Sequence, residues 1–435
     1  MHIDLVKVQK VFFIGIGGIG ISAIARMMHQ EGKVISGSDM QRNTVIEELE
    51  KIGIAISFGQ GRDFIPSDTD LIIYTIALEV YDPALLNEIK SLSIPTLSYP
   101  EALEAVTKDK YTIAVSGTHG KTTTTAMIGH VLQEAGKDPS MIVGSLLVGS
   151  KSNFVQGSTD LFVVEACEYK RSFLHISPKI LVITNIDEDH LDYYKDIEDI
   201  ENAFNELAKK VPENGVIIAD KNDKRVERAL RGVVAPILDY KSFLTKRVLK
   251  IPGVHNQLNA SAAASVCHYL SVDTKRIDKA LESFPGTWRR FEERGILSGG
   301  AKVYDDYAHH PKEVETTLKG FRELYAKPFY TITVLFQPHL FSRTKAFLED
   351  FSKAFNEADR IIILPIFPAR EVDDGTISAE ILAQKIRTHT EDVASMTFEE
   401  AIHVMQKMNF DSHDIIVTMG AGEAYKIGDT LLGRE

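Results

Sequence analysis

The chain has 435 residues, and its 49 basic and 61 acidic side chains give a formal net charge of −12. The length predicts about two to four domains, and 44% hydrophobic with 25% charged residues is typical of a globular protein, not a disordered or fibrous one. The acidic balance argues against a nucleic-acid binder, which needs a basic surface. No apolar run approaches the roughly 18 residues that span a bilayer, and two cysteines make no disulfide framework. We therefore expect a cytoplasmic protein without membrane insertion or secretory signal.

Short apolar strands alternate with turns and helical patterns along the chain, which predicts an α/β fold of parallel sheets with helices on both faces. In the first block we expect a strand over residues 10–14, a helix ending near Gln30, and further strands over 34–36 and 70–74. Residues 99–110 are charged and helical, and we interpret them as a linker to the second block.

The residues between the first strand and its helix fit the pattern G-x-G-x-x-G, with glycines at Gly15, Gly17, Gly18 and Gly20. The first glycine permits a tight turn, the second lets the backbone approach a diphosphate, and the third lets the helix pack closely on the strand. The helix N-terminus then offers N–H groups to the anion. Asp39 ends the second strand, about where an acidic residue would meet a ribose hydroxyl. The pattern predicts a diphosphate site for NAD, FAD or a nucleotide sugar, and a plain tight turn is the alternative.

A second glycine-containing loop follows the strand predicted over residues 111–115 and precedes a helix that ends near Gly136. Its members are Gly117, Thr118, His119, Gly120, Lys121, Thr122 and Thr123. In such a loop backbone N–H groups surround the β- and γ-phosphates, Lys121 neutralises them and the Thr122 hydroxyl binds Mg²⁺. Val115 stands where the common P-loop spacing needs glycine, so this loop is shorter. We predict an ATP site, because such a run has no purpose in core packing.

Acidic and imidazole side chains follow two further strands of the second block. Glu165 stands at the end of the strand over 161–164, and His190 comes shortly after the strand over 180–184. Mg²⁺ prefers a few carboxylate and hydroxyl oxygens together with phosphate oxygens and water. We therefore predict that Thr122, Glu165 and His190 meet at the mouth of one sheet as metal ligands. The alternatives are a solvated carboxylate for Glu165 and a capping role for His190.

Three polar positions in the second block have structural interpretations. Cys167 lacks the surroundings of a Cys-His catalytic pair, so we expect a small buried side chain there. Cys267 lies inside the helix predicted over 258–270, beside its apolar stripe, and is assigned to packing. Asn256 precedes that helix, where an N-cap and a functional contact are both open.

In the third block the predicted strands each end in polar sequence. They cover residues 301–304, 330–336, 360–365 and 414–418. Ligands bind beyond the carboxyl ends of strands in open parallel sheets, so these ends are site candidates. Tyr307 and His309 follow the first strand, and Arg343, past the second, could bind a small carboxylate. Just before the block, Arg289 and Arg290 form a tandem pair suited to phosphates and carboxylates, or to plain surface ion pairs.

Taken in chain order, these motifs resemble the Mur ligase family over the whole chain. The motifs are the first glycine turn, Gly117 to Thr123, Glu165-Ala166-Cys167-Glu168, Asn185 to His190, His255-Asn256, Arg289-Arg290-Phe291-Glu292, Asp305 to Pro311, Phe336-Gln337-Pro338-His339 and Gly420-Ala421-Gly422. The resemblance implies a Rossmann-like UDP-sugar-binding domain over 1–107, a central parallel-sheet, P-loop-type ATPase domain over 108–285 and a Rossmann-like amino-acid-binding domain over 286–435. It also implies closure by hinge motion near residues 108 and 286.

The resemblance further implies an activity in the synthesis of peptidoglycan precursors. The lactyl carboxylate of UDP-N-acetylmuramate attacks the γ-phosphate of ATP, and the amine of L-alanine then attacks the acyl phosphate and expels phosphate. ATP and Mg²⁺ are the implied cofactors, and a monomer or weak homodimer is expected. Because a carboxylate attacks a polyanion reluctantly, Lys121, Mg²⁺ and an arginine must offset the charge.

Residue roles are implied by matching positions to the family's motifs. The catalytic residues would be Lys121, Arg290 and His309. The ATP contacts outside the loop would be Asn185, His255, Asn256 and Arg290, and the Mg²⁺ ligands would be Thr122, Glu165 and His190. The amino acid would meet Tyr307, His309 and Arg343, and the UDP sugar would meet Gly15, Gly17, Gly18, Gly20 and Asp39. The chain departs from the family at Cys167, often Asp, and at Leu340, sometimes Arg, which leaves Arg343 as the carboxylate anchor.

Three other functions are weighed against this one. A murein peptide ligase would add a recycled tripeptide to the same sugar, but the short loop after Arg343 and the chain length favour a single amino acid. An NAD-linked dehydrogenase would explain only the first glycine turn. A nucleotide-binding regulatory protein without ligase activity is disfavoured by the intact Lys121, Thr122, Glu165 and His190.

Overall fold

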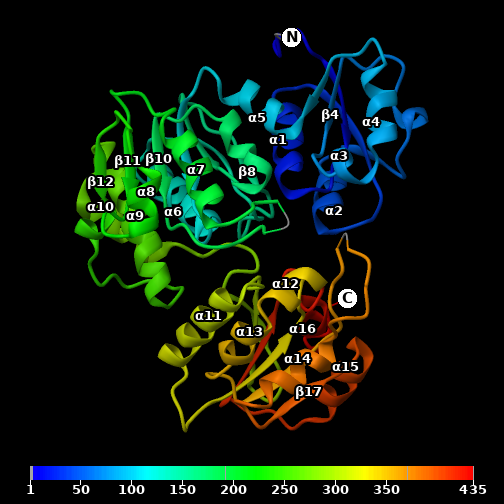
Figure 1. Ribbon diagram of the computed structural model, residues 1–435, viewed down its shortest axis with the longest axis vertical. Helices are drawn as coiled ribbons and strands as arrows, with labels where there is room; N and C mark the ends of the chain where they lie inside the picture. The colour runs from blue at the N-terminus through cyan, green and yellow to red at the C-terminus, as the bar shows by residue number, and fades with distance from the viewer. Residues whose placement is uncertain (1–2, 192, 370, 435) are drawn as a thin grey trace. The chain divides into compact units, whose positions relative to one another are not determined.

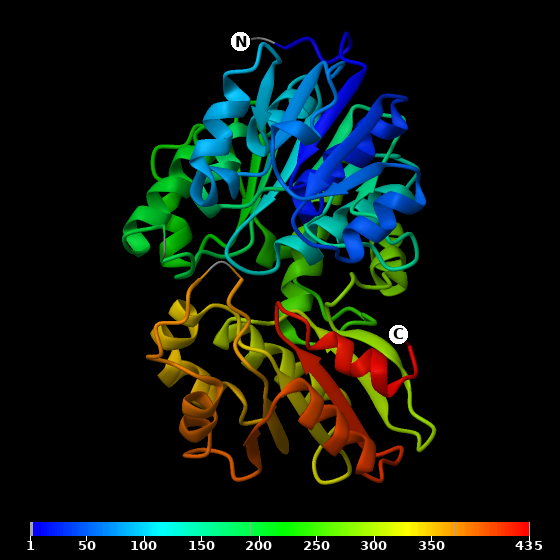
Figure 2. The same ribbon diagram turned by 90° about the vertical axis from the view of Figure 1, so that its right-hand side faces the viewer.

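The computed structural model describes residues 3–191, 193–369 and 371–434, which form three β-sheets (Figure 1; Figure 2). Packing divides these residues into two compact units. Unit 1 contains the residues up to Val248 together with Leu258–Phe284, and unit 2 contains Leu249–Gln257 together with the residues from Pro285 on. The first two sheets belong to unit 1 and the third to unit 2. The boundaries of the three implied domains stay a prediction.

The first sheet is parallel throughout, with strand order β3-β2-β1-β4-β5. Its strands are β1 Lys10–Ile14, β2 Val34–Asp39, β3 Ala55–Phe58, β4 Leu71–Tyr74 and β5 Thr96–Ser98. The helices are α1 Ile19–Gln30, α2 Thr44–Lys51, η1 Arg62–Phe64, α3 Leu78–Tyr81, α4 Pro83–Lys90 and α5 Tyr99–Thr107. Four of the five residues of β1 are buried, as expected for a central strand covered on both faces. Its carboxyl end delivers the glycine turn to the edge of this sheet.

Helix α5 is an integral part of unit 1, and the interpretation of this stretch as a linker is wrong. A capping box begins the helix, in which Ser98 and Glu101 exchange side-chain and backbone hydrogen bonds. Ala102, Leu103 and Val106 are buried in the same hydrophobic core as residues of both sheets of unit 1. The charged residues lie on the other face of the helix, which is why the composition resembled that of a linker.

The second sheet has the order β12-β11-β10-β6-β9-β7-β8 and is parallel except between β7 and β8. Its strands are β6 Tyr111–Ser116, β7 Ser140–Ile142, β8 Phe154–Val155, β9 Leu161–Glu165, β10 Ile180–Ile183, β11 Val216–Ala219 and β12 Ile237–Asp239. The helices around it are α6 Lys121–Glu134, η2 Tyr169–His175, α7 Ile197–Ala208, α8 Lys224–Ala229, η3 Tyr240–Phe243, α9 Val254–Tyr269 and α10 Thr274–Ser283. Because β6 lies between β10 and β9, the segments that follow these three parallel strands leave the sheet side by side.

The third sheet has the order β13-β14-β18-β15-β16-β17 and is parallel except between β13 and β14. Its strands are β13 Glu292–Ile296, β14 Lys302–Asp306, β15 Thr331–Phe336, β16 Arg360–Ile363, β17 Val393–Ser395 and β18 Asp414–Met419. The helices are α11 Pro311–Leu324, α12 Phe341–Ala346, α13 Leu348–Ala354, α14 Ala379–Ile386, α15 Phe398–Lys407 and α16 Tyr425–Leu431. Strands β14, β15 and β18 are neighbours at its centre, so the polar sequences after them share one edge.

The α/β class and the parallel pairing predicted from the sequence are confirmed, while the antiparallel strands β8 and β13 were not foreseen. Helix α9 begins at Val254, ahead of the predicted start, so Asn256 lies within its first turn and the N-cap alternative for Asn256 is excluded. Cys267 is buried in α9, as predicted. In the described part of the chain, no helix is both long and apolar enough to cross a membrane.

Candidate functional site

The second glycine-containing loop, Gly117 to Thr123, connects β6 to the start of α6 and is called the phosphate loop below. Two of its glycines are required by geometry. Gly117 and Gly120 have φ angles of 132° and 82°, in the region that disfavours any side chain. A Cβ on Gly117 would lie 2.0 Å from the hydroxyl oxygen of Thr184. On Gly120 it would lie 2.4 Å from the side-chain oxygen of Asn259. The loop is therefore pressed against the residues after β10 and against α9.

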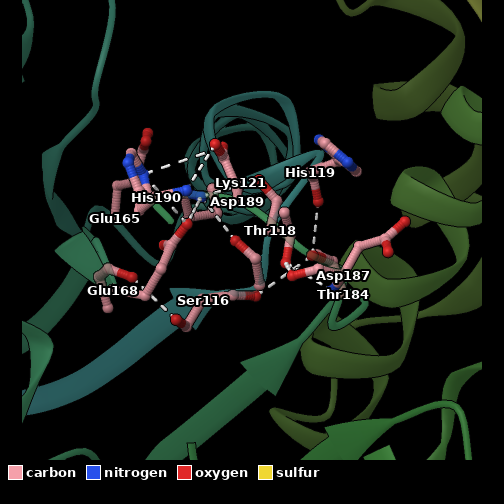
Figure 3. Close-up of polar contacts among 12 residues, drawn as sticks. Ser116, Thr118, His119, Lys121, Glu165, Glu168, Thr184, Asp187, Asp189 and His190 are labelled. Carbon is pink, nitrogen blue, oxygen red and sulfur yellow. Dashed lines mark hydrogen bonds and ion pairs between the residues drawn. The ribbon is translucent and has the colours of Figure 1, made fainter. Parts of the chain in front are cut away.

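Asn185 holds the loop from outside. Its side-chain oxygen accepts a hydrogen bond from the backbone N–H of His119 at 3.0 Å, and its side-chain N–H₂ donates to the carbonyl of the same residue at 2.9 Å. The Thr184 hydroxyl donates to that carbonyl at 2.6 Å (Figure 3). Thr118 donates its backbone N–H to the carbonyl of Asn185 at 3.0 Å. Asn185, predicted as an ATP contact, thus fixes the backbone that would surround the phosphates.

Lys121, the first residue of α6, folds back onto its own loop. Its ammonium group donates to the carbonyls of Gly117 at 2.6 Å and Thr118 at 2.9 Å, and to Glu168 Oε1 at 2.9 Å. An ammonium has three N–H donors, so these acceptors use all of them. Burial alone lowers the pKa of Lys121, but the acidic neighbours, Glu168 foremost, more than offset this and raise it. The side chain is therefore charged.

Thr122 and Glu165, two of the predicted metal ligands, are brought together. The Thr122 hydroxyl donates to Glu165 Oε1 at 3.1 Å, and the other carboxylate oxygen accepts from the backbone N–H of Gly144 at 2.8 Å. A Cβ on Gly144 would lie 2.4 Å from Glu165 Oε1, so the carboxylate needs a glycine at this position. Glu165 is thus held at the end of β9, and the alternative of a freely solvated carboxylate is wrong.

His190, the third predicted ligand, lies against different carboxylates. Its Nε2 is 3.8 Å from Glu168 Oε1 and 3.9 Å from Asp189 (Figure 3). Its ring packs against that of Tyr169, with centroids 4.8 Å apart. Among the described residues, no group of three or more His, Cys, Asp and Glu side chains could hold a metal ion by itself. A metal shared by Glu165 and His190 stays a prediction.

Sequence reasoning assigned no role to Glu168, which the structure places at the centre of this site. Its side chain is 3% exposed, and the carboxylate oxygen Oε2 is buried without a hydrogen-bond partner. The available signal was a second carboxylate three residues after Glu165, following a buried strand. Cys167 between them is exposed, so the expectation of a small buried side chain is wrong. Its neighbours Ala166 and Glu168 are the buried residues of this segment.

The first glycine turn is closed by the residue predicted to meet a ribose. Gly15 has a φ angle of 75°, and the backbone N–H of Gly17 donates to Asp39 Oδ2 at 2.8 Å. Gly18 forms the N-cap of α1, and a Cβ on Gly20 would lie 2.7 Å from the ring of Tyr99. One carboxylate oxygen of Asp39 is therefore hydrogen-bonded within the turn itself, and the contact of Asp39 with a ribose stays a prediction.

Asn43, which sequence reasoning missed, joins this turn to α2. Its side-chain oxygen accepts from the backbone N–H of Ile46 and caps the helix, and its N–H₂ group donates to the carbonyl of Gly17 at 3.3 Å. An Asn before a helical pattern is a cap signal that could have found it. The turn is thus held by two polar side chains that follow β2.

In unit 2 the tandem arginines have different environments. Arg289 is 3% exposed, and its guanidinium donates to Asp305 at 2.6 Å and to the carbonyls of Gly420 and Gly422 at 2.6 and 2.9 Å. Arg290 lies over the ring of Tyr307, 5.2 Å from its centroid. Surface ion pairing is therefore wrong for Arg289, which holds the glycine loop after β18. Arg290 stays the candidate for phosphate.

The adjacent acids of the same motif are structural. Asp305 pairs with Arg289, and Asp306 accepts from the backbone N–H groups of Phe291 at 2.7 Å and Ala308 at 2.9 Å. Burial raises the pKa of Asp306 to about 6, against the opposing effect of Arg290 and these N–H groups. The two carboxylates thereby fix the segments that carry Arg290 and Tyr307.

The three predicted amino-acid contacts fall in one cluster after β14 and β15. His309 Nδ1 lies 2.9 Å from the carbonyl of Tyr307 and 3.4 Å from Glu313. The ring of His339 is 5.9 Å from that of His309, and its Nδ1 lies 3.3 Å from a guanidinium nitrogen of Arg343. His339, which had been noted only as part of a motif, thus links the other members.

Two predicted ATP contacts, His255 and Asn256, belong to unit 2. Asn256 donates from its side chain to the carbonyl of Pro252 at 2.7 Å. Burial, and to a smaller extent the charge of Arg290, lower the pKa of His255 to about 4, against the opposing effect of Glu313. His255 is therefore neutral near neutral pH and lies in the electrostatic neighbourhood of the candidate phosphate arginine.

Three family models match the chain in succession: "Mur ligase family, catalytic domain" over residues 10–111, "Mur ligase middle domain" over 115–242 and "Mur ligase, glutamate ligase domain" over 289–422. A UDP-N-acetylmuramate–L-alanine ligase from Acetivibrio thermocellus is 41% identical, with 99% of this chain and 97% of the relative covered. The solved UDP-N-acetylmuramate–alanine ligase MurC of Thermotoga maritima is similar with a TM-score of 0.80, 26% identity and 98% of each chain covered. A murein peptide ligase from Psychrobacter arcticus shares the fold with a TM-score of 0.73, 24% identity and 98% of each chain covered.

Proposed function

The chain belongs to the Mur ligase family, and on that premise we propose that it is an ATP-dependent ligase that joins L-alanine to the lactyl carboxylate of UDP-N-acetylmuramate, in the synthesis of peptidoglycan precursors. The observation that carries the proposal is the 41% identity to an L-alanine ligase over almost the whole of both chains. The site geometry supports it, since a phosphate loop, a lysine and a Thr–Glu pair stand at the ends of two neighbouring strands, β6 and β9.

Two bond-forming steps make up the proposed reaction. A lactyl carboxylate oxygen attacks the γ-phosphorus of ATP, the bond to ADP breaks, and an acyl phosphate forms. The amine of L-alanine then attacks the acyl carbon, an amide forms, and phosphate leaves. Lys121 and Arg290 would offset the negative charge of the phosphates, which otherwise repels the attacking carboxylate.

The cluster of Tyr307, His309 and Arg343 would receive the amino acid. Arg343 can bind its carboxylate, because a guanidinium offers paired N–H donors. A hydrogen bond from Nδ1–H of His309 to the Tyr307 carbonyl leaves Nε2 as the nitrogen able to accept a proton from the amine. That proton must leave before the amine can attack the acyl carbon.

We also propose Mg²⁺ as the metal that accompanies ATP. The donors fit it, because a hydroxyl and a carboxylate that lie 3.1 Å apart, Thr122 and Glu165, are hard oxygen ligands. His190, together with Glu165, would hold a second Mg²⁺. When bound, Mg²⁺ would neutralise phosphate charge; phosphate oxygens and water would complete its ligands.

The remaining parts of the proposal concern the whole protein. We propose a cytoplasmic monomer or weak homodimer that binds the UDP sugar at the first glycine turn, Gly15 to Gly20 with Asp39. A reducing compartment is supported by the two cysteines, both of which are free thiols.

The test is phosphate release from ATP and Mg²⁺ with UDP-N-acetylmuramate, while L-alanine, glycine, L-serine or the tripeptide L-Ala-γ-D-Glu-meso-diaminopimelate is added one at a time. We expect release that depends on both the sugar and L-alanine. Release only with the tripeptide would move the protein to the recycling reaction. Silence with every acceptor, under conditions in which ATP binds, would contradict any ligase activity.

A loop variant separates binding from chemistry in the same assay. Lys121→Ala should lose phosphate release by orders of magnitude and still bind the UDP sugar, because the proposed sugar site belongs to the other sheet of unit 1. Retained turnover would refute the role assigned to Lys121.

A further inference from the structure

Glu168 is the buried carboxylate that the proposed reaction leaves without a role. Resting on the proposed ATP site, we propose that Glu168 makes nucleotide binding depend on a divalent cation, by holding Lys121 before phosphates bind and by repelling phosphates that arrive without a cation. Three features of the site support this role: the contacts of Lys121, the anchoring of Glu168 and the polar atoms left without partners.

The first feature is the saturation of Lys121. Its three acceptors are the carbonyls of Gly117 and Thr118 and the carboxylate of Glu168, at 2.6, 2.9 and 2.9 Å. No N–H of the ammonium remains for a phosphate oxygen, so a phosphate must displace one of them. The carboxylate is the only charged member of the three, and it is therefore the acceptor with which a phosphate competes electrostatically.

The second feature is the anchoring of Glu168. Its carbonyl accepts from the hydroxyl of the buried Tyr194 at 2.5 Å and from the backbone N–H of Arg171 at 2.8 Å. Lys170 and Arg171 have positive φ angles of 50° and 56°, which turn the chain sharply after Glu168. Because two hydrogen bonds fix its carbonyl and its side chain is only 3% exposed, the carboxylate is held in the buried site beside Lys121.

The third feature is the presence of two buried atoms without hydrogen-bond partners, Glu168 Oε2 and His190 Nδ1. Their side chains are neighbours, with Glu168 Oε1 3.8 Å from His190 Nε2 (Figure 3). Orphaned polar atoms in a buried site cost free energy unless a ligand satisfies them. A cation that arrives with ATP would compensate this carboxylate and the phosphates together, whereas metal-free phosphates that displace Glu168 from Lys121 would leave its negative charge uncompensated beside their own in a low-dielectric site.

The experiment measures binding, not turnover. The affinity of a non-hydrolysable ATP analogue is determined by calorimetry with Mg²⁺ and with a chelator, for the full chain and for Glu168→Gln. The quantity compared is the ratio of the two affinities. We expect Glu168→Gln to reduce this ratio about tenfold, mainly by tighter binding of the metal-free analogue. An unchanged ratio, or equal weakening under both conditions, would overturn the proposal.

Two variants serve as controls. Glu188→Gln removes the same charge from an exposed position in the loop that carries His190, and it should leave the ratio at the wild-type value. Glu168→Asp keeps the charge and should retain most of the metal dependence. A ratio lowered equally by Glu188→Gln would refute a specific role of Glu168, because the effect would then follow from the loss of any negative charge near the site.

If Glu168→Gln does not fold, Tyr194→Phe provides the second test. It removes the hydroxyl that anchors Glu168 and keeps the carboxylate, so the metal dependence should fall part of the way; an unchanged ratio would again overturn the proposal. Failure of the proposed function is distinguishable from either result, because it would show as silence in the phosphate-release assay, whereas the affinity ratio is measured without turnover.

Discussion

Arg289 and Arg290 are adjacent in sequence but differ in burial and in their contacts. Arg289 is buried, bonded to Asp305 and to two glycine carbonyls, and packed over the rings of Tyr307 and Tyr425 at 5.1 and 4.7 Å. Such a buried pair is costly to break on one side, because a charge would be left without a partner. The consequence is functional: Arg289 fixes the backbone from which Arg290 extends, so that only one arginine of the pair is available for phosphate.

His255 leads to a pH-dependence prediction at the same scale. Its pKa is lowered to about 4 by burial and by Arg290, so folding holds the imidazole neutral. A group with a depressed pKa contributes stability that is complete above its unfolded value of about 6.5 and is lost as the pH falls toward the folded value. Between neutral pH and about pH 4 the wild type should therefore lose about 3 kcal/mol more unfolding free energy than His255→Gln.

Urea unfolding at a series of pH values would measure this difference. His389→Gln removes an exposed histidine of the same unit and should match the wild type at every pH. Equal acid sensitivity of His255→Gln and the wild type would show that this imidazole is not the group responsible.

At the scale of elements, α6 carries the site because its first turn and its preceding loop are shaped by glycines with positive φ. Gly120 is the N-cap residue immediately before the helix and has φ 82°, and Gly136 follows the end of the helix with φ 74°. The two positions have the same backbone strain for any other residue, but a Cβ on Gly120 would collide with Asn259 at 2.4 Å, while a Cβ on Gly136 would meet nothing within 4 Å. Gly136 is therefore a matched control for Gly120.

We predict that Gly136→Ala destabilises the protein by about 1–2 kcal/mol, the cost of a left-handed residue with a side chain, and that Gly120→Ala destabilises it by at least as much because of the added collision with Asn259. Only Gly120→Ala should also lose nucleotide binding, at least tenfold, because the loop backbone must shift. Thermal unfolding and calorimetric titration of both variants would measure the two effects. Equal nucleotide affinity in the two variants would contradict the role of the loop geometry.

At the scale of the whole molecule, the candidate residues are divided between two compact units. The phosphate loop, the metal candidates and the first glycine turn belong to unit 1, whereas His255, Arg290 and the amino-acid cluster belong to unit 2. The proposed reaction needs groups from both units at one acyl phosphate. Ligand-driven closure is therefore expected for this chain.

Small-angle scattering with and without an ATP analogue plus UDP-N-acetylmuramate tests this expectation. The radius of gyration should fall when both ligands are present and should fall less with either ligand alone. An unchanged scattering curve under saturating conditions would count against closure.

Much of the molecule follows from local sequence. The strand β1, predicted over residues 10–14, is found at those residues, and the helices after both glycine motifs begin where the motifs predict, because apolar runs and obligatory glycines are short-range signals. Strands β8 and β13 were missed, since a two-residue strand and a polar antiparallel edge have no strong periodicity. Helix α5 was misread as a linker because only its buried face makes it part of the core.

The sequence by itself determined the α/β class, the family and the placement of Lys121, Thr122 and Glu165 at strand ends, because each depends on residues close together in the chain. Tertiary structure alone decided that Glu168 meets Lys121, that Asn185 clasps the loop at His119, and that Arg289, not Arg290, is buried. The contacts Lys121–Glu168, Asn185–His119 and Arg289–Asp305 join residues that are 47, 66 and 16 positions apart along the chain. Partners at such separations are selected by strand order and packing, which no local pattern records.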